Sequence, residues 1–375
     1  MLKIVADSYI PFLKGALDRV AQVRYIQGSE IKREHLVDTD ALIIRTRTKC
    51  NKALLNNTPI KFIASATIGF DHIDTEYCHQ NGIKWTNAPG CNSGSVKQYV
   101  ASAIAEIISR EKWQFHNITL GIIGAGNVGK KVENMCKTLG IKTLINDPPR
   151  ERVEGKGSFT NINELILRSD IITMHVPLIN QGIDKTCHLA DSTFFSRMKK
   201  GSWFINTARG EVADSFALTK SLKNKHIRGA VIDVWENEPE INRELLAASN
   251  IATPHIAGYS ADGKANGTAM SVRAISKFFN LGLDSWFPPN IPSATNNHFQ
   301  VNCIGKSLEG IYKEISLFAY NIKQDSDTLK KSPETFEKQR ENYPVRREPE
   351  HISVELNSCS NSILSIIKNL DYLII

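Results

Sequence analysis

Short apolar runs alternate with helical stretches along the first 90 residues of the chain. The apolar runs are rich in β-branched and aliphatic side chains and predict strands at 2–6, 20–26, 41–45, 61–66 and 83–86. Strands that alternate with helix-length segments are typical of a parallel sheet with helices on its faces. The N-terminal part of the chain is therefore expected to form an α/β lobe.

A second α/β unit follows a longer helical pattern. Apolar residues recur at helical spacing over 94–110, which predicts a helix long enough to cross between two lobes. Beyond it, six strands are predicted at 118–123, 141–146, 170–176, 202–206, 229–234 and 250–253. Six parallel strands suit a doubly wound dinucleotide-binding domain of the Rossmann type.

The C-terminal part of the chain contains one more long helix, a proline-rich break and a further α/β module. The segment 261–281 has a helical pattern and is expected to return to the first lobe, which makes that lobe discontinuous in sequence. Three prolines between 286 and 297 interrupt the pattern and indicate a linker. The predicted domains are a flavodoxin-like substrate-binding lobe at 1–93 and 257–285, a Rossmann domain at 94–256, a linker at 286–297 and an α/β domain at 298–375.

Composition and charge exclude several classes of protein. The chain has 375 residues, 41% hydrophobic and 23% charged, which is ordinary for a soluble globular protein. No apolar stretch approaches the roughly 18 residues of a membrane span, and no signal-peptide core is present, so we expect a cytoplasmic protein without a membrane partner. The net charge of +7 is dispersed and lacks clustered basic and aromatic residues, so nucleic acid is not expected as a partner.

The cysteines indicate neither a disulfide framework nor a metal site. There are seven of them, an odd number, and they are widely spaced and never in a Cys-x-x-Cys arrangement. We therefore expect reduced thiols and no bound metal.

A glycine fingerprint lies between the predicted strand at 118–123 and the helix that follows it. The first glycine of such a motif permits a tight turn, the second lets the backbone approach a pyrophosphate, and the third lets helix and strand pack closely. A glycine-rich turn without a ligand is the alternative interpretation. The fingerprint residues expected to contact a cofactor are Gly124, Gly126, Asn127, Val128 and Gly129.

Asp147 strengthens the nucleotide interpretation and indicates which nucleotide binds. It follows the next predicted strand, 18 residues past Gly129, where a carboxylate can hydrogen-bond the adenosine ribose. A carboxylate there repels the 2′-phosphate of NADP, so the expected cofactor is NAD. Arg150 could reach a 2′-phosphate, and a clear kinetic preference for NADP would contradict the prediction.

Three ionisable residues, Arg209, Glu238 and His255, follow the carboxyl ends of the later strands. Each alone could be a loop charge, a surface acid or a buried polar residue. Their joint occurrence downstream of a nucleotide fingerprint favours a hydride-transfer site. His255 is expected to act as general base, because an imidazole titrates near neutrality. Glu238 would orient the imidazole and stabilise its positive charge, and Arg209 would bind a substrate carboxylate bidentately.

Several motifs carry a resemblance to a known family. The fingerprint, Asn206-x-x-Arg209-Gly210, Asp233-Val-Trp-x-x-Glu238-Pro239 and Pro254-His255-Ile-Ala-Gly258 occur in that order. The chain thereby resembles the D-isomer-specific 2-hydroxyacid dehydrogenases over nearly its whole length. Further motifs, such as Asp147-Pro-Pro-Arg150 and Tyr343-Pro-Val-Arg-Arg347, are most similar to those of members that oxidise 4-phospho-D-erythronate in pyridoxal 5′-phosphate (vitamin B6) biosynthesis.

The resemblance implies a function and a set of site residues. It implies NAD-dependent oxidation of 4-phospho-D-erythronate to 3-hydroxy-2-oxo-4-phosphooxybutanoate, with Arg209, Glu238 and His255 as the catalytic set. It also implies a homodimer formed through the C-terminal domain. The further cofactor positions it implies are Val176, Thr207, Asp233 and Gly258, and the substrate positions are Thr46, Thr67 and Tyr259.

Substrate preference is less well defined by the sequence. Arg45 belongs to a basic cluster with Arg47 and Lys49 at the end of a predicted strand, where a substrate phosphate needs cations, although a solvated basic loop explains it equally well. Thr46 also departs from the serine that is commoner in this branch of the family. The alternatives are a dehydrogenase for another D-2-hydroxy acid such as D-3-phosphoglycerate, a non-catalytic NAD-sensing protein, and a tail that binds a regulatory amino acid.

Overall fold

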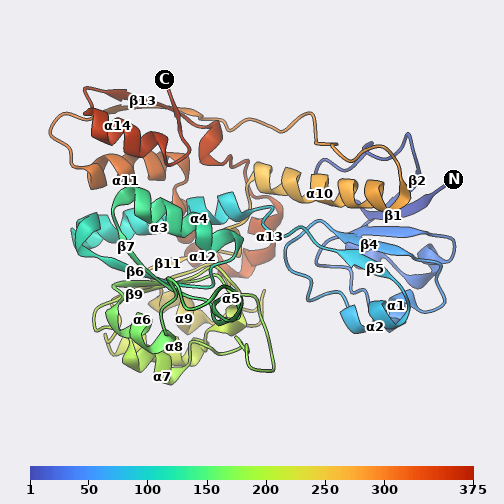
Figure 1. The fold of residues 1–375 in the computed structure, drawn as a ribbon, viewed down its shortest axis with the longest axis horizontal. Helices are drawn as coiled ribbons and strands as arrows, with labels where there is room; N and C mark the ends of the chain where they lie inside the picture. Colours follow the sequence, from blue (N-terminus) through green and yellow to red (C-terminus); the bar gives the residue numbers. More distant parts are fainter. The chain divides into compact units, whose positions relative to one another are not determined.

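The structure, a computed structural model, describes residues 1–375 and divides into two compact units (Figure 1). Unit 1 comprises Met1–Asn92 and Ser260–Ser293. Unit 2 comprises Ser93–Tyr259 and Ala294–Ile375. The predicted domain boundaries, including the linker at 286–297, stay predictions.

Unit 1 is built on a five-stranded parallel sheet with the order β2-β1-β3-β4-β5. This order is that of the flavodoxin-like doubly wound fold, which confirms the predicted fold of the first lobe. The strands are β1 (Lys3–Asp7), β2 (Gln22–Ile26), β3 (Ala41–Ile44), β4 (Phe62–Ser65) and β5 (Lys84–Thr86).

Helices cover both faces of the unit 1 sheet (Figure 1). On one face lies α10 (Ala261–Phe279), whose Val272 and Ile275 are buried in one cluster with Ile43 of β3. On the other face lie α1 (Lys52–Leu55) and α2 (Thr75–Gln80), in a second cluster with Ile44. Because successive side chains of a strand point to opposite faces, Ile43 and Ile44 belong to different cores.

Unit 2 contains the predicted six-stranded parallel sheet, with the order β11-β10-β9-β8-β6-β7. The chain winds in both directions from β6, so the topological switch point lies at the carboxyl ends of β6 and β8, where ligands bind in such sheets. Beyond β7, the chain adds only an isolated bridge between Ile145 and Phe159. The strands are β6 (Thr119–Ile123), β7 (Lys142–Asn146), β8 (Ile171–Met174), β9 (Trp203–Asn206), β10 (Gly229–Ile232) and β11 (Ile251–Ala252).

Two hydrophobic clusters attach helices to the faces of this sheet. One cluster joins it to α3 (Ser93–Glu111) and α4 (Asn127–Leu139). The other joins it to α6 (Ile162–Arg168), α7 (Ser192–Arg197), α8 (Ser215–Lys223) and α9 (Arg243–Ala248), and the short α5 (Pro148–Glu154) follows β7. None of the helices is both long and apolar enough to cross a membrane.

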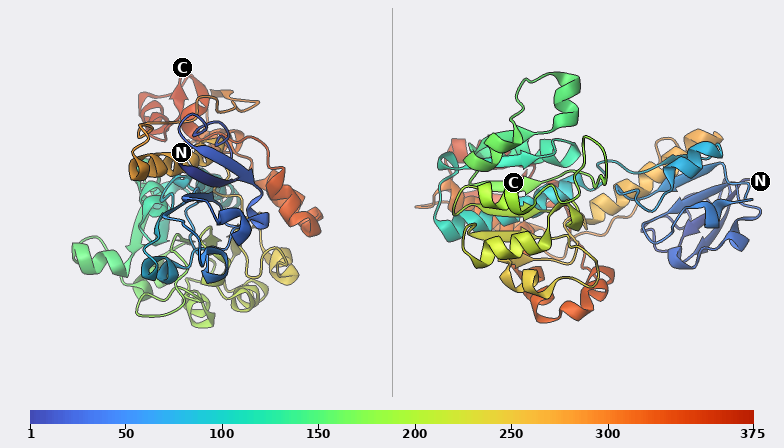
Figure 2. Two further views of the ribbon diagram at one scale, coloured as in Figure 1. Left: turned by 90° about the vertical axis from the view of Figure 1, so that its right-hand side faces the viewer. Right: turned by 90° about the horizontal axis from the view of Figure 1, so that it is seen from below.

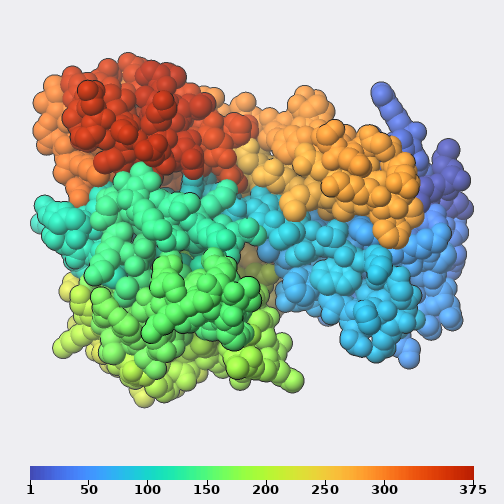
Figure 3. Space-filling model, viewed as in Figure 1, coloured from blue at the N-terminus to red at the C-terminus, as the bar shows by residue number.

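The C-terminal segment folds as α/β structure, as predicted, and packs on the part of unit 2 that contains the six-stranded sheet. Figure 3 shows its red surface against the green surface of residues around 130, and α11 packs on α3. Both views of Figure 2 place its orange-red helices near the yellow α9, and α12 lies along β11, where the Ser326 hydroxyl accepts the Ala252 N–H at 3.0 Å. Its elements are the parallel strands β12 (His298–Asn302), β13 (Ser353–Asn357) and β14 (Leu373–Ile374) and the helices α11 (Leu308–Ala319), α12 (Ile322–Lys331), α13 (Phe336–Glu341) and α14 (Asn361–Lys368).

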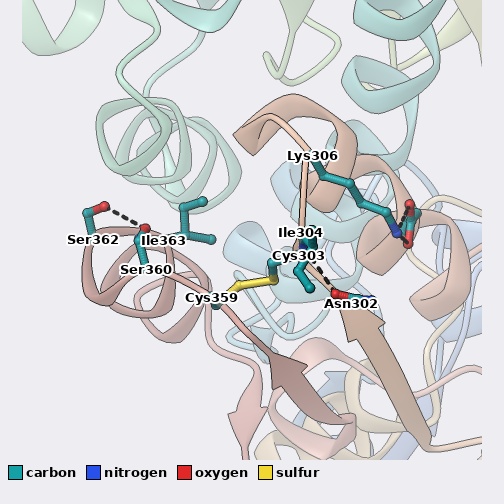
Figure 4. The surroundings of a disulfide bond; sticks show 9 residues. Asn302, Cys303, Ile304, Lys306, Cys359, Ser360, Ser362 and Ile363 are labelled. Carbon is teal, nitrogen blue, oxygen red and sulfur yellow. Dashed lines mark hydrogen bonds and ion pairs between the residues drawn. A yellow bond between two sulfur atoms is a disulfide. The ribbon is translucent and has the colours of Figure 1, made fainter.

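A disulfide bond joins Cys303 and Cys359 in this segment, with their Cα atoms 5.1 Å apart (Figure 4). The expectation that all cysteines are free thiols is therefore wrong for this pair, whereas the other five are free. The parallel pairing of β12 with β13 brings the two cysteines together, and the Cys303 N–H donates to the Asn357 carbonyl at 2.9 Å. A separation of 56 residues carries no local signal for such a pairing.

Candidate active site

The three fingerprint glycines differ in what the protein requires of them. Gly124 has φ +91°, and a Cβ there would meet the His175 backbone at 2.7 Å. A Cβ on Gly129 would meet the Gly124 carbonyl oxygen at 2.1 Å. Gly126 has φ −73°, and no protein atom lies within 4 Å of a Cβ built there. Neither backbone conformation nor packing demands glycine at 126, so the position is open to the close approach of a ligand, and the free N–H groups at the start of α4 could hold a pyrophosphate.

Asp147 lies directly beside this fingerprint. Its Oδ2 accepts the Ala125 N–H at 2.8 Å, and its Oδ1 accepts the Arg150 N–H at 3.1 Å at the start of α5. The Arg150 guanidinium donates to the Ala125 carbonyl and forms two bonds of 2.6–2.7 Å with Glu154. The charge of Arg150 is therefore paired with Glu154, and the contact of Asp147 with a ribose stays a prediction.

His175, which the sequence analysis missed, links the ends of β8 and β9 at the predicted cofactor positions Val176 and Thr207. Its Nδ1 lies 3.2 Å from the Thr207 hydroxyl, and its Nε2 lies 3.0 Å from the Thr173 hydroxyl. Burial lowers the pKa of His175 to about 3, so the imidazole is neutral, with one ring nitrogen as donor and the other as acceptor. Its position next to Val176, at the end of a strand beside the fingerprint, is the signal that could have found it.

The predicted catalytic residues follow the ends of three neighbouring strands. In the sheet, β9 pairs with β10 and β10 with β11, so the loops of Arg209, Glu238 and His255 leave adjacent strand ends. The structure brings two of the side chains into contact: Nδ1 of His255 lies 2.7 Å from Oε2 of Glu238. Arg209 lies on the loop after β9, half-buried, and its Nη1 donates to the Ala208 carbonyl at 2.8 Å.

The surroundings of Glu238 keep it ionised. Burial alone would raise its pKa, but the charge of His255 and hydrogen bonds from His255 and the Trp235 N–H outweigh burial and lower it. The Trp235 N–H reaches Oε1 at 2.9 Å, so both carboxylate oxygens have partners. The guanidinium of Arg340, in α13, lowers the pKa of Glu238 further. The pair is thus an anion held against an imidazole.

Asp233 holds the loop that carries His255. It is buried, and it accepts hydrogen bonds from the Thr253 hydroxyl at 2.6 Å and from the backbone N–H groups of Ile256 and Ala257 at 2.8 and 2.9 Å. Burial raises its pKa. His255 itself has φ +56°, an uncommon conformation for a residue other than glycine. The predicted contact of Asp233 with the nicotinamide stays a prediction, as does that of Gly258, half-buried in the same loop.

The C-terminal segment contacts Tyr259, the predicted substrate residue next to this loop, through two side chains. The Tyr343 ring packs edge-on against it at 6.0 Å, and the Arg340 guanidinium lies 5.7 Å from its ring centre. The sequence analysis assigned neither residue to the site. The aromatic and basic run from Tyr343 to Arg347 in a highly charged segment was the available signal, and it was interpreted as a family motif and a sign of dimerisation, without a place in the site.

The other predicted substrate residues belong to unit 1. Arg45 and Thr46 begin the loop after β3, and the Arg45 guanidinium donates to the Tyr9 carbonyl at 3.1 Å. Thr67 follows β4, with its hydroxyl 2.9 Å from that of Ser65. Ser65 in turn lies 3.2 Å from Nε2 of His72, whose pKa is lowered by burial. Strands β3 and β4 are neighbours, so these polar groups leave adjacent strand ends.

Comparison with known proteins identifies the family. Residues 97–257 match the D-isomer specific 2-hydroxyacid dehydrogenase NAD-binding domain, and residues 291–367 match a domain of unknown function, DUF3410. The chain is 49% identical over 349 residues to an erythronate-4-phosphate dehydrogenase of Bacteroides thetaiotaomicron, covering 92% of this chain and 97% of that protein. The chain belongs to the erythronate-4-phosphate dehydrogenase family.

More distant relatives agree with this assignment. An erythronate-4-phosphate dehydrogenase of Escherichia coli O157:H7 is 38% identical over 354 residues, or 92% of both chains. Among solved structures, the D-lactate dehydrogenase of Aquifex aeolicus, complexed with NAD and lactic acid, is 27% identical with a TM-score of 0.64, over 77% of this chain and 100% of that one. The family resemblance, the α/β fold and the NAD-binding domain predicted from sequence are confirmed. The protein is an NAD-dependent oxidoreductase.

Proposed function

We propose that this protein oxidises the C2 hydroxyl of 4-phospho-D-erythronate, with NAD as hydride acceptor, in the biosynthesis of pyridoxal 5′-phosphate. The family relatives that carry the name of this activity support the substrate. The observation that carries the chemistry is the 2.7 Å contact of Glu238 with His255 beyond the ends of β10 and β11. It pairs an anion with a base on the side of the sheet where nucleotide domains bind their ligands.

His255 is the proposed general base. With Nδ1 bonded to the Glu238 carboxylate, Nε2 is the ring nitrogen that can accept the C2 hydroxyl proton. The Glu238 carboxylate then stabilises the imidazolium that forms. Bound NAD would supply the acceptor for the hydride that leaves C2. Arg209 is proposed to hold the substrate carboxylate and polarise the C2 oxygen, which develops carbonyl character in the reaction.

Substrate recognition is proposed to use hydroxyl and cationic side chains. Thr46, Thr67 and Tyr259 offer hydroxyls suited to a polyhydroxy acid, and Arg45 offers a cation for the phosphate. We further propose that the active protein is a cytoplasmic homodimer formed through its C-terminal domain. Sedimentation of the purified protein at micromolar concentration tests the dimer, which a monomer would contradict.

The decisive experiment measures NADH formation by the purified protein. 4-Phospho-D-erythronate, 3-phosphoglycerate and D-lactate are compared with NAD and with NADP. The highest kcat/KM is expected for 4-phospho-D-erythronate with NAD. A preference for 3-phosphoglycerate would move the protein to a different substrate within the same chemistry. Binding of NADH without turnover of any of the acids would instead support a non-catalytic NAD-sensing protein.

A further inference from the structure

We propose that Arg346, in the C-terminal segment between α13 and β13, is a positioning residue for His255. It holds the carbonyl side of the peptide groups that follow His255, while Asp233 holds their N–H side. This inference rests on the proposed role of His255 as general base. It gives the C-terminal segment a part in positioning the base, in addition to any role in dimerisation.

The contacts of Arg346 converge on the loop after His255. Its Nη2 donates to the carbonyl oxygens of Ile256 at 3.0 Å and Ala257 at 2.6 Å. The N–H groups of the same two residues donate to Asp233. The N–H groups of Ile256 and Ala257 are therefore held by the buried carboxylate of Asp233, and their carbonyl oxygens by the buried guanidinium of Arg346.

Ser95, at the start of α3, completes this arrangement. Its hydroxyl donates to the Ala257 carbonyl at 2.8 Å and lies 2.5 Å from Nη2 of Arg346. The Ala257 carbonyl thus has two donors from distant parts of the chain. Such a convergence fixes the backbone of the loop more tightly than either donor could alone.

The burial of Arg346 argues that these bonds are the reason for its presence. Its side chain is 6% exposed and lies against the rings of Tyr320 at 4.3 Å and Tyr343 at 5.6 Å. Its charge is balanced by the nearby carboxylates of Asp233 and Asp325. Burying a guanidinium costs more than burying an apolar side chain of similar volume. In return, the buried guanidinium makes hydrogen bonds to the carbonyl oxygens of Ile256 and Ala257.

The conformation of His255 shows why its loop needs to be held. Its φ of +56° lies in the left-handed region, which persists only where the surroundings over-determine it. Asp233 and Arg346 supply that restraint from the residues immediately after the imidazole. A displacement of about 1 Å in a reacting group can cost about 10²-fold in rate.

The test compares Arg346→Met and Arg346→Lys with Arg273→Met as a matched control. Arg273, in α10, also donates to a backbone carbonyl, that of Trp286 at 2.8 Å, and also lies over an aromatic ring, that of Phe287 at 5.9 Å. Arg346→Met is expected to lower kcat by about 10- to 100-fold with the KM and the NADH Kd within about 3-fold of the parent, because the base is misplaced rather than the ligands. Arg346→Lys, which keeps the charge, should recover part of the loss, and the control should keep the parent kcat.

Amide hydrogen exchange gives a readout independent of activity. In Arg346→Met, or in Arg346→Lys if the methionine variant does not fold, exchange should rise by about 10-fold in a peptide spanning 253–259 and stay unchanged in β8 and β9. Uniformly raised exchange across unit 2, or parent-like kcat in both variants, would overturn the proposal. If the parent protein oxidises no 2-hydroxy acid, the proposed function fails, whereas the exchange experiment still decides whether Arg346 holds the loop.

Discussion

Oε2 of Glu238 and Nδ1 of His255 lie 2.7 Å apart, and the backbone of His255 has φ +56°. A second histidine–glutamate pair in the same unit has the same N···O distance, although through the other ring nitrogen: Nε2 of His188 lies 2.7 Å from Oε1 of Glu236, and His188 has φ +51°. The two pairs differ in location. Only the first follows the ends of β10 and β11, beside the loop that Asp233 and Arg346 hold.

Because the two histidine–glutamate pairs are similar, His188 provides a control for a test of His255 as the general base. His255→Asn is expected to lower kcat by about 10²- to 10⁴-fold, because positioned proton transfer contributes that much. Asparagine tolerates a positive φ, so the backbone should be retained. His188→Asn removes an equivalent ion pair and should leave kcat within about 2-fold. Equal losses in the two variants, measured by steady-state kinetics, would contradict the assignment of His255.

Substitution of Gly126 is expected to weaken cofactor binding without affecting stability, whereas substitution of Gly129 is expected to destabilise the fold. Gly126→Ser should keep the thermal stability, because serine is a favourable residue before the first turn of a helix. Its side chain should nevertheless raise the NADH Kd by about 10-fold or more, equivalent to about 1.4 kcal/mol, by blocking the approach of the pyrophosphate.

Gly129→Ala is the comparison for that variant. Its Cβ would lie 2.1 Å from the Gly124 carbonyl oxygen, so it should destabilise the protein by about 1–3 kcal/mol. Thermal unfolding and NADH fluorescence titration measure the two effects. Tight NADH binding by a folded Gly126→Ser protein would exclude the fingerprint as the pyrophosphate site.

Glu238 predicts a pH-dependent contribution to stability. Its pKa in the folded protein is lowered below the usual 4.5, chiefly by His255 against the opposing effect of burial. Ionised Glu238 therefore stabilises the fold above that pH, and the contribution is lost as the pH falls through the lower folded-state pKa. The parent should unfold at a higher temperature than Glu238→Gln at pH 7, and the difference should shrink as the pH is lowered below 4.5. A difference that is constant over this range would refute the lowered pKa.

The disulfide predicts a redox-dependent stability of the C-terminal segment. Closing a loop of 56 residues is worth up to about 4 kcal/mol by restriction of the unfolded chain. Dithiothreitol, or the double variant Cys303→Ser/Cys359→Ser, should lower the free energy of unfolding by an amount approaching this value. Cys187→Ser, at a half-buried free cysteine, should have little effect. Mass spectrometry of non-reduced peptides tests the bond directly.

Local patterns were sufficient to predict most of the fold and the centre of the site. All six strands of the unit 2 sheet lie within the predicted ranges, because buried parallel strands are continuous apolar runs. Glu238 and His255 could be predicted as partners because parallel strands end at one edge of the sheet. In each case, the determining residues are close in sequence to the feature they specify.

The features that escaped prediction depend on contacts between distant residues. Arg346 reaches Ala257 across 89 residues, and Cys303 pairs with Cys359 across 56, and no periodicity encodes either contact. The position of Arg346 follows from the packing of the C-terminal segment on α3 and β11, which is a tertiary property. The half-buried imidazole of His175 likewise gains its partner Thr207 only when β8 and β9 pair.

The two outer strands of the six-stranded sheet are both covered. At one edge, the Ser326 hydroxyl of α12 accepts a hydrogen bond from the Ala252 N–H of β11. At the other edge, the Thr160 N–H donates to the Ile145 carbonyl of β7. Each outer strand therefore has at least one edge group paired within the molecule, which reduces the open ladder offered to a strand from another molecule and helps to protect the sheet against edge-to-edge aggregation. Deletion of the C-terminal segment would therefore expose the edge of β11. The exposed edge would make the protein prone to self-association.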